Sequence, residues 1–193
     1  MAFFGKKEKS QEEPKAKKSI GREIFEWIMV FVVAGALALT VRTLIFEPVR
    51  VDGESMQNTL QDGDFMIATK FDYLLGNPER FDIVICHYPN SDGRYRVKRV
   101  IGLPGETIEL RGKSLYINGE LTEQPFDALY DYENVGSFGP YTVPEGHYFV
   151  MGDHRTNSRD SRDSMVGALD RSMIKGHVRL VVFPFSDACI MPY

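Results

Sequence analysis

One long apolar segment constrains this chain more than any other feature. Residues 27–41 read WIMVFVVAGALALTV, a run without a charge, and the apolar character continues to Phe46 if Arg42 is tolerated near its end. A helix of about 20 residues rises about 30 Å, which is the thickness of the hydrocarbon core of a bilayer. Trp27 can anchor one interface, and the long Arg42 side chain can extend to the other. The segment therefore predicts a single transmembrane helix over residues 23–46.

Two other interpretations of the apolar segment are weaker. A buried helix of a soluble protein would show a polar face, which this run lacks. A cleaved secretory signal would fit the small residues of Ala34-Gly35-Ala36 or Ala36-Leu37-Ala38. Both of these sites lie inside the apolar run, whereas a cleavage site normally follows it. We therefore predict a permanent membrane anchor.

The charge distribution predicts the orientation of that anchor. Residues 1–22 carry seven Lys or Arg and three Glu, a local balance of +4. Because positive residues before an anchor stay in the cytoplasm, we predict a disordered cytoplasmic tail over residues 1–22 and an extracytoplasmic domain over residues 47–193 at the cell membrane. The whole chain carries −4, so the remainder carries −8. An acidic body argues against a nucleic acid partner.

Past residue 46 the sequence has the pattern of a mainly β, antiparallel domain. Short β-branched and aromatic runs alternate with Gly, Pro, Asn and Asp, and Asn118-Gly119 and 111–113 are typical of tight hairpin turns. We predict an irregular loop over 123–141. The predicted strands are Val49–Val51, Asp64–Thr69, Asp82–Tyr88, Arg94–Ile101, Thr107–Arg111, Ser114–Ile117, His147–Met151 and Gly176–Phe183.

Cysteines and histidines give little support to a metal site. Cys86 and Cys189 form no C-x-x-C pattern, and no two of the four histidines have an H-x-x-x-H spacing. We therefore expect no metal and no cofactor. The two cysteines are compatible with a disulfide in an oxidising space, but two buried free thiols are the simpler expectation.

Ser55 is the first candidate nucleophile. It lies in VRVDGESMQNTL, residues 49–60, directly after the apolar segment. A Ser-His-Asp hydrolase would combine it with His154 and Asp153, but adjacent residues usually point in different directions and are poorly placed to act together. The remaining candidate base is a lysine.

Lys98 can serve as that base if its surroundings are apolar. In RYRVKRVIGLPGE, strand alternation places Arg96, Lys98 and Val100 on one face. A buried ammonium loses hydration, its pKa falls, and a neutral amine can take a proton from serine. An exposed lysine would be an ordinary solvated charge.

A third stretch, residues 152–162, reads GDHRTNSRDSR and contains no large apolar side chain. It fits either a solvated loop or the wall of a site. In the second case Asp160 and Arg162 would form a buried pair, and Ser158 would be able to hydrogen-bond an amine.

The order of these segments resembles that of the bacterial type I signal peptidases. An anchor, then GESMxxTL, then RVKRVIGLPGE, then GDHRxNSxDSR follow one another over residues 25–185 with the family's spacing. The resemblance implies a membrane-bound serine endopeptidase that cuts signal peptides from exported precursor proteins.

The resemblance also implies roles for individual residues. Ser55 would be the nucleophile and Lys98 the general base of a Ser-Lys dyad, with Ser158 orienting the lysine amine. Charged residues matching those that hold the family's site together are Arg99, Asp153, Asp160 and Arg162. Residues at the family's substrate-pocket positions are Val51, Met56 and Leu60. Repressor-type autoproteases also use a Ser-Lys pair but lack this membrane segment.

The sequence departs from the family pattern at three positions. Some members place a hydroxyl two residues before the nucleophile as a second oxyanion donor, and this chain has Gly53 there. Losing such a donor costs on the order of 3 kcal/mol, so a replacement is expected. Asn58 stands where proline is common, and His154 where asparagine is frequent. Neither changes the predicted dyad.

These observations predict a monomer whose partners are membrane lipid and the signal peptides of exported precursors. The extended segment 47–52 would offer an edge against which a substrate strand can lie. The alternative from another class is a membrane-anchored β-domain that binds export partners without catalysis.

Overall fold

The computed structural model describes residues 19–89 and 93–191, without the side chains of residues 43, 44, 74 and 75. The predicted tail over residues 1–22 therefore lies almost entirely outside the described residues. The chain divides into two compact units, Met1–Leu39 and Thr40–Tyr193. Each is described by itself.

Helix α1, Ile20–Leu44, confirms the predicted N-terminal apolar helix, but it ends before the predicted residue 46, because Phe46 begins β1. Its stretch Ile20–Arg42 is 23 residues long with a mean hydropathy of 2.3, and none of it is buried in protein. Apolar side chains are exposed on all sides of the helix, including Phe25, Phe31 and Leu37. Such a helix has no polar face for water and is long enough to cross a membrane.

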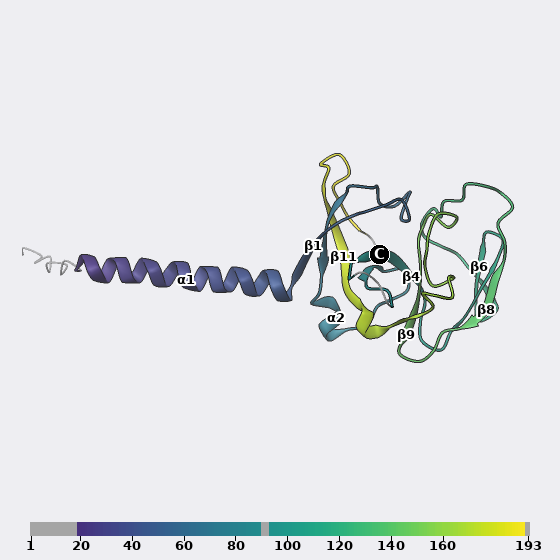
Figure 1. Cartoon of the computed structure of the whole chain (residues 1–193), viewed down its shortest axis with the longest axis horizontal. Helices are drawn as coiled ribbons and strands as arrows, with labels where there is room; N and C mark the ends of the chain where they lie inside the picture. Colours follow the sequence, from purple (N-terminus) through teal and green to yellow (C-terminus); the bar gives the residue numbers. More distant parts are fainter. Residues whose placement is uncertain (1–18, 90–92, 192–193) are drawn as a thin grey trace, which may run out of the picture. The chain divides into compact units, whose positions relative to one another are not determined.

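The second unit is built from two antiparallel sheets, as predicted (Figure 1). The larger sheet has the order β1-β2-β11-β3-β4-β9-β10, with β12 paired to β11. Its strands are β1 (Phe46–Arg50), β2 (Phe65–Thr69), β3 (Ile83–Cys86), β4 (Arg96–Gly102), β9 (His147–Met151), β10 (Leu169–Asp170), β11 (Ile174–Phe183) and β12 (Cys189–Ile190). Two short helical turns, α2 (Asp72–Leu75) and η1 (Arg171–Met173), lie between strands.

The smaller sheet has the order β7-β6-β5-β8. Its strands are β5 (Thr107–Arg111), β6 (Ser114–Ile117), β7 (Glu120–Thr122) and β8 (Phe138–Thr142). The Asn118-Gly119 turn joins β6 to β7, and both residues have the positive φ that a tight hairpin requires. An apolar cluster that includes Ile101 of β4, Ile108 of β5 and Phe149 of β9 joins the two sheets.

The prediction of an irregular loop over 123–141 is wrong at its end, because β8 begins at Phe138. The Gly139-Pro140 pair is typical of a loop, so the strand was not predicted. Proline is tolerated there because β8 is an edge strand. Strand β1 begins at Phe46, three residues before the predicted start at Val49. It includes Pro48, which is tolerated because β1 is also an edge strand. The short strands β7, β10 and β12 were not predicted.

Both cysteines are free, with Cys86 buried and Cys189 exposed. The alternative of a disulfide is therefore not realised. The expectation of two buried thiols is correct for Cys86 and wrong for Cys189, which is exposed on the two-residue strand β12.

Candidate active site

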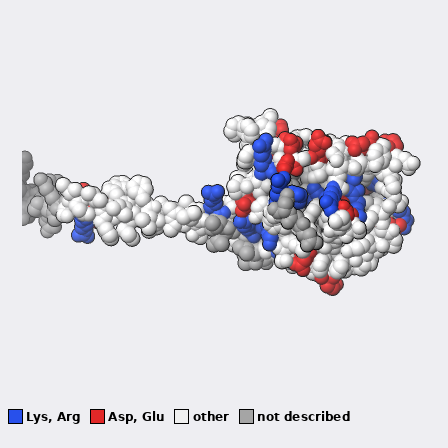
Figure 2. Space-filling view, viewed as in Figure 1, with Lys and Arg blue, Asp and Glu red and all other residues white. Residues whose placement is uncertain are grey.

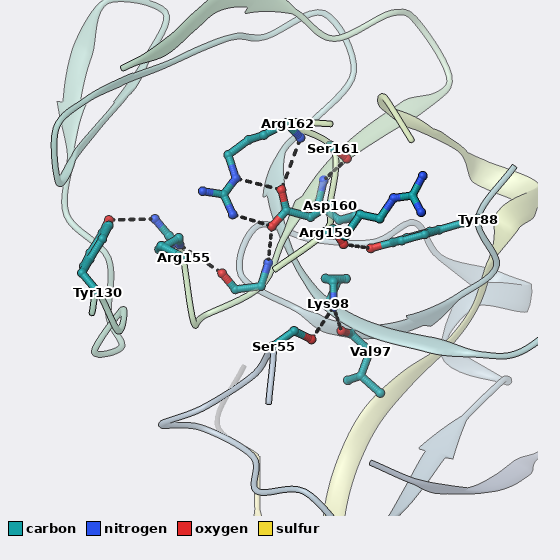
Figure 3. A network of polar contacts seen from close by, with 12 residues as sticks. Ser55, Tyr88, Val97, Lys98, Tyr130, Arg155, Arg159, Asp160, Ser161 and Arg162 are labelled. Atoms are coloured by element: carbon teal, nitrogen blue, oxygen red, sulfur yellow. Dashed lines mark hydrogen bonds and ion pairs between the residues drawn. The ribbon is translucent and has the colours of Figure 1, made fainter. Parts of the chain in front are cut away.

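Ser55 and Lys98 meet although they are far apart in the sequence. Ser55 lies in the turns that follow β1, and Lys98 lies in the middle of β4. Lys98 Nζ donates a hydrogen bond of 2.6 Å to Ser55 Oγ and a second of 2.9 Å to the carbonyl of Val97 (Figure 3). The candidate nucleophile and candidate base are thus in direct contact.

Lys98 lies in buried surroundings, which is the condition under which it could act as a base. Its partner across the sheet is Val84, within a strand in which every residue is buried, and Lys98 itself is only 3% exposed. The opposite face of β4 is buried as well, since Arg99 is 1% exposed. Both faces of this strand are therefore inside the protein.

Burial is the main influence on the pKa of Lys98 and lowers it below the ordinary 10.5. The nearby positive charge of Arg96 acts in the same direction, whereas the carboxylates of Asp160 and Asp153 oppose it. Burial also raises the pKa of Cys86 to about 12, so its thiol is neutral and contributes no anion beside the lysine. A neutral amine in hydrogen-bond contact with a serine hydroxyl can take its proton.

Arg99 and Asp153 form a buried ion pair next to the dyad. The guanidinium Nη2 lies 2.7 Å from Asp153 Oδ2, and both side chains are almost fully buried. Thr59 Oγ1, from the turns that carry Ser55, donates to the same carboxylate oxygen at 2.5 Å. Arg99 also lies over the ring of Phe126, 3.9 Å from its centroid. The pair thus ties β4, the segment after β9 and the nucleophile's turns together.

Asp160 and Arg162 form the ion pair predicted for the polar loop, with Asp160 buried and Arg162 half-buried. Arg162 binds both carboxylate oxygens of Asp160 at 2.8 Å, and the backbone N–H of Gly152 donates to Asp160 at 2.9 Å (Figure 3). Burial opposes ionisation of Asp160, but these bonds prevail and lower its pKa. Asp160 therefore stays a buried carboxylate that fixes the loop.

Ser158 is half-buried with its hydroxyl oxygen inside the protein near Ser55, but the structure does not show the predicted contact with the lysine. Its hydroxyl makes no hydrogen bond of ordinary geometry within the described residues. A Cβ added at Gly152 would collide with the Ser158 hydroxyl and with the Ser55 carbonyl. Ser158 thus packs against the same glycine as the nucleophile's backbone.

Gly53 contributes backbone but no hydroxyl. Its N–H donates to Asp62 Oδ1 at 2.8 Å, and its φ of +101° lies in the region that favours glycine. Glu54, between Gly53 and Ser55, accepts a hydrogen bond of 3.1 Å from the Asn157 side chain. The residues around the nucleophile are therefore held by bonds that the sequence pattern did not reveal.

The Ser-His-Asp alternative is not assembled among the described residues. His154 Nε2 lies 2.9 Å from Asp131 Oδ1, and Asp153 is engaged by Arg99. Only the backbone N–H of His154 contacts the nucleophile, donating to the Ser55 carbonyl at 3.1 Å. The candidate base whose side chain contacts Ser55 is Lys98.

The three predicted pocket residues Val51, Met56 and Leu60 are buried in one apolar cluster, together with Val97 of β4. They surround Ser55 in the sequence and form part of the core beneath it. Whether they receive a substrate side chain stays a prediction. Within residues 19–89 and 93–191, no group of three His, Cys, Asp or Glu is placed to hold a metal ion.

Four residues at the site were missed from the sequence: Thr59, Asp62, Asp131 and Asn157. Thr59 was within the quoted motif GESMxxTL, so its position was a usable signal. Asn157 was likewise within the quoted motif GDHRxNSxDSR. The contacts of Asp62, Asp131 and Asn157 run across 9, 23 and 103 positions, which no local pattern encodes.

Comparison with known proteins gives a consistent result. The family described as "Signal peptidase, peptidase S26" matches residues 24–183. A signal peptidase I of Bacillus amyloliquefaciens is 42% identical over 187 residues, covering 92% of this chain and 96% of the relative. Signal peptidase I T of Bacillus subtilis (strain 168) is 40% identical over 187 residues, covering 93% and 96%. A solved signal peptidase I of Enterococcus faecalis V583 is 36% identical, with a TM-score of 0.46, and covers 53% of this chain and 97% of that one.

Proposed function

Because this chain belongs to the signal peptidase family, peptidase S26, we propose that it cleaves signal peptides from exported precursors with a Ser55–Lys98 dyad. Membership in this family makes it a serine-type hydrolase. The observation that carries the proposed dyad is the 2.6 Å hydrogen bond between a buried lysine amine and the Ser55 hydroxyl.

The chemistry begins with a neutral Lys98. Ser55 Oγ attacks the scissile carbonyl carbon while Lys98 Nζ takes the hydroxyl proton. The Ser55 backbone N–H stabilises the negative oxygen of the tetrahedral intermediate. The protonated lysine then gives its proton to the leaving amine, and the mature protein departs from an acyl-enzyme.

Hydrolysis of the acyl-enzyme uses the same amine. Lys98 takes a proton from a water molecule as that water attacks the ester carbonyl. The second tetrahedral intermediate collapses, the proton returns to Ser55 Oγ, and the cleaved signal peptide leaves as a carboxylic acid. Arg99, Asp153, Asp160 and Arg162 act as positioning residues, since their bonds hold β4 and the loops around the dyad.

Substrate recognition and location are part of the same proposal. Val51, Met56 and Leu60 form the walls of shallow pockets that accept small side chains at the first and third positions before the cut. Residues 1–22 form a cytoplasmic tail, 23–46 the anchor and 47–193 the extracytoplasmic catalytic domain of a monomer. An anchor places the nucleophile where precursors emerge with their signal still in the bilayer.

Two substitutions test the dyad. Ser55→Ala removes the nucleophile, and Lys98→Met removes the base while keeping an apolar side chain of similar length. We expect each to reduce cleavage of a synthetic signal peptide in detergent to background, with an unchanged circular dichroism spectrum. Ser114→Ala and Lys113→Met, on the smaller sheet, are matched controls that should cleave normally. Normal activity of either dyad variant would refute the mechanism.

A serine-directed acylating inhibitor separates this enzyme from a non-catalytic binding domain. Mass spectrometry should find the acyl group on Ser55, and the label should be absent in Lys98→Met, because the hydroxyl is not activated without its base.

A further inference from the structure

A groove lies between β1 and the chain segment that enters β4, the two segments that precede Ser55 and Lys98 in the chain. Its volume is about 320 Å3, and it is lined by Pro48, Arg50 and Asp52 on one side and by Arg94 and Arg96 on the other. Asp52 precedes Ser55 by three residues and Arg96 precedes Lys98 by two, so the chain segments that line the groove lead directly into the two residues of the dyad. A peptide that lies in the groove and reaches Ser55 therefore runs along both segments.

Both walls of the groove offer backbone that is not used by a sheet. Among the described strands, β1 pairs only with β2 and forms one end of the sheet order. β4 pairs with β9 only from Arg99 onward, so Arg96–Lys98 has a described strand partner, β3, on one side alone. Edge backbone of this kind can pair with an added extended peptide.

The lining of the groove is positively charged. Its described residues carry three guanidinium groups, Arg50, Arg94 and Arg96, and one carboxylate, Asp52. Residues 23–193 carry a net charge of −8, so this is the opposite of the average charge of that part of the chain. Figure 2 shows Lys and Arg side chains gathered in the middle of the visible face of the Thr40–Tyr193 unit, between the positions of β1 and β4 in Figure 1.

Strand geometry gives the substrate position that these charges face. Arg94 lies two residues before β4 and four before Lys98; if the chain stays extended, at about 3.3 Å per residue, it lies about 13 Å from the dyad. An extended substrate covers that distance in four residues. Counting back from the residue whose carbonyl Ser55 attacks, the fifth residue before the cut lies beside Arg94, with Arg50 on the facing wall.

We propose that Arg50 and Arg94 determine charge specificity at the fifth substrate residue before the cut, favouring an acidic side chain and disfavouring a basic one. This inference rests on the proposed function. Attraction between exposed opposite charges strengthens binding about two- to fivefold, and repulsion between like charges weakens binding by a similar factor. The effect weakens with added salt because the groups are open to solvent.

The test compares three synthetic peptides that differ only at the fifth residue before the cut, with Asp, Asn or Lys there. Using the full-length protein in detergent, we expect kcat/KM to fall in the order Asp, Asn, Lys, with about fivefold or more between Asp and Lys. Arg50→Gln/Arg94→Gln should bring the three values together, and Arg50→Glu/Arg94→Glu should reverse their order. About 1 M salt should reduce the difference in the wild type.

The Asn peptide serves as the control for folding and for the proposed function. Arg111→Gln on β5, the matched arginine substitution outside the groove, should cleave it within about twofold of the wild type. If the wild type cleaves all three peptides equally, the charge preference is overturned while the proposed function stands. If it cleaves none of them, the proposed function fails and this inference fails with it. If the arginines instead serve lipid phosphate, the double variant lowers binding to anionic vesicles and leaves the peptide ratio unchanged, which also overturns the preference.

Discussion

At the scale of single residues, the site depends on removing water from Lys98. A lysine on a solvated strand would be protonated at neutral pH and could not accept a proton from serine. Here it is buried on β4, and its amine has two oxygen partners, Ser55 Oγ and the Val97 carbonyl. The hydrogen-bond geometry directs the nitrogen at the hydroxyl, and burial supplies the free energy that favours the neutral form.

The pH dependence of activity tests the state of Lys98. Protonated Lys98 cannot act as a base, so kcat/KM should rise with pH and level off at an apparent pKa below 10.5. The measurement is the initial rate on a synthetic signal peptide from about pH 6 to about pH 10. A rate that still rises tenfold per pH unit close to the ordinary lysine value would contradict the lowered pKa.

The pH dependence of stability is an independent check of the lowered pKa of Lys98, and stability, like activity, should rise with pH. Because the folded pKa of Lys98 is lowered, the unfolded chain binds more protons between that value and 10.5. The free energy of unfolding should therefore rise with pH across this window in the wild type. In Lys98→Met this contribution should be absent, which urea titrations at several pH values would show.

Gly152 is a second residue on which the geometry depends. A methyl group there would collide with the Ser55 carbonyl and the Ser158 hydroxyl. We expect Gly152→Ala to cost about 1–3 kcal/mol of stability, because neither neighbour can move without disturbing the loop. It should also lower kcat by displacing Ser55, measured with the same peptide. Gly136→Ala is the matched control, since nothing lies within 4 Å of its added Cβ. Equal activity of both variants would show that the loop adapts.

At the scale of secondary-structure elements, the sequence predicted the strands well and the contacts between them poorly. β5, β6 and β9 have the predicted bounds, because each is a short apolar alternation between clear turn residues. β8 was missed because Gly139-Pro140 resembles a loop, and only its place at a sheet edge allows it. Pairing of β4 with β3 brings Lys98 opposite Val84. Residue alternation within β4 could not predict this contact, because it depends on which strand pairs with β4.

The same limit applies to the candidate site. Ser55 and Lys98 were predicted from motif resemblance, and the structure brings them together. The binding of Gly53 N–H by Asp62 and of Glu54 by Asn157 could not be predicted, because these bonds depend on how separate loops close over the turns.

The junction of three elements at Asp153 yields a prediction about stability. Asp153→Ala leaves the buried Arg99 guanidinium without its carboxylate, and an unpaired buried charge costs about 3–5 kcal/mol. Chemical denaturation should show this loss, and activity should fall because Thr59 loses the acceptor that holds the nucleophile's turns. Asp127→Ala, in the exposed part of a loop, is the matched control and should be neutral.

A double variant separates charge from packing at this junction. Arg99→Met/Asp153→Leu removes both charges, so it should recover much of the lost stability without recovering activity. A double variant as unstable as Asp153→Ala would show that lost packing, such as the contact of Arg99 with Phe126, accounts for the effect.

At the scale of the whole molecule, an apolar helix and a β-rich unit follow one another along the chain, and each suits a different solvent. Ile20–Arg42 exposes apolar side chains on all sides, which costs free energy in water and is favourable in lipid. The Thr40–Tyr193 unit encloses its own apolar clusters and needs no lipid to bury them. With a balance of +4 in residues 1–22, the positive-inside rule predicts that the second unit lies on the outer side of the membrane.

The two cysteines provide a built-in test of this orientation. Cys189 is exposed on β12 and Cys86 is buried in β3, so a membrane-impermeant maleimide should modify only Cys189 in the folded protein. In intact protoplasts that make the full-length protein, we expect the same labelling before and after lysis, because the second unit faces outward. Cys189→Ser should abolish the label and Cys86→Ser should keep it. Labelling that requires lysis would place the unit in the cytoplasm, where it could not meet exported precursors, and would overturn the proposed topology while leaving the dyad open to its own test.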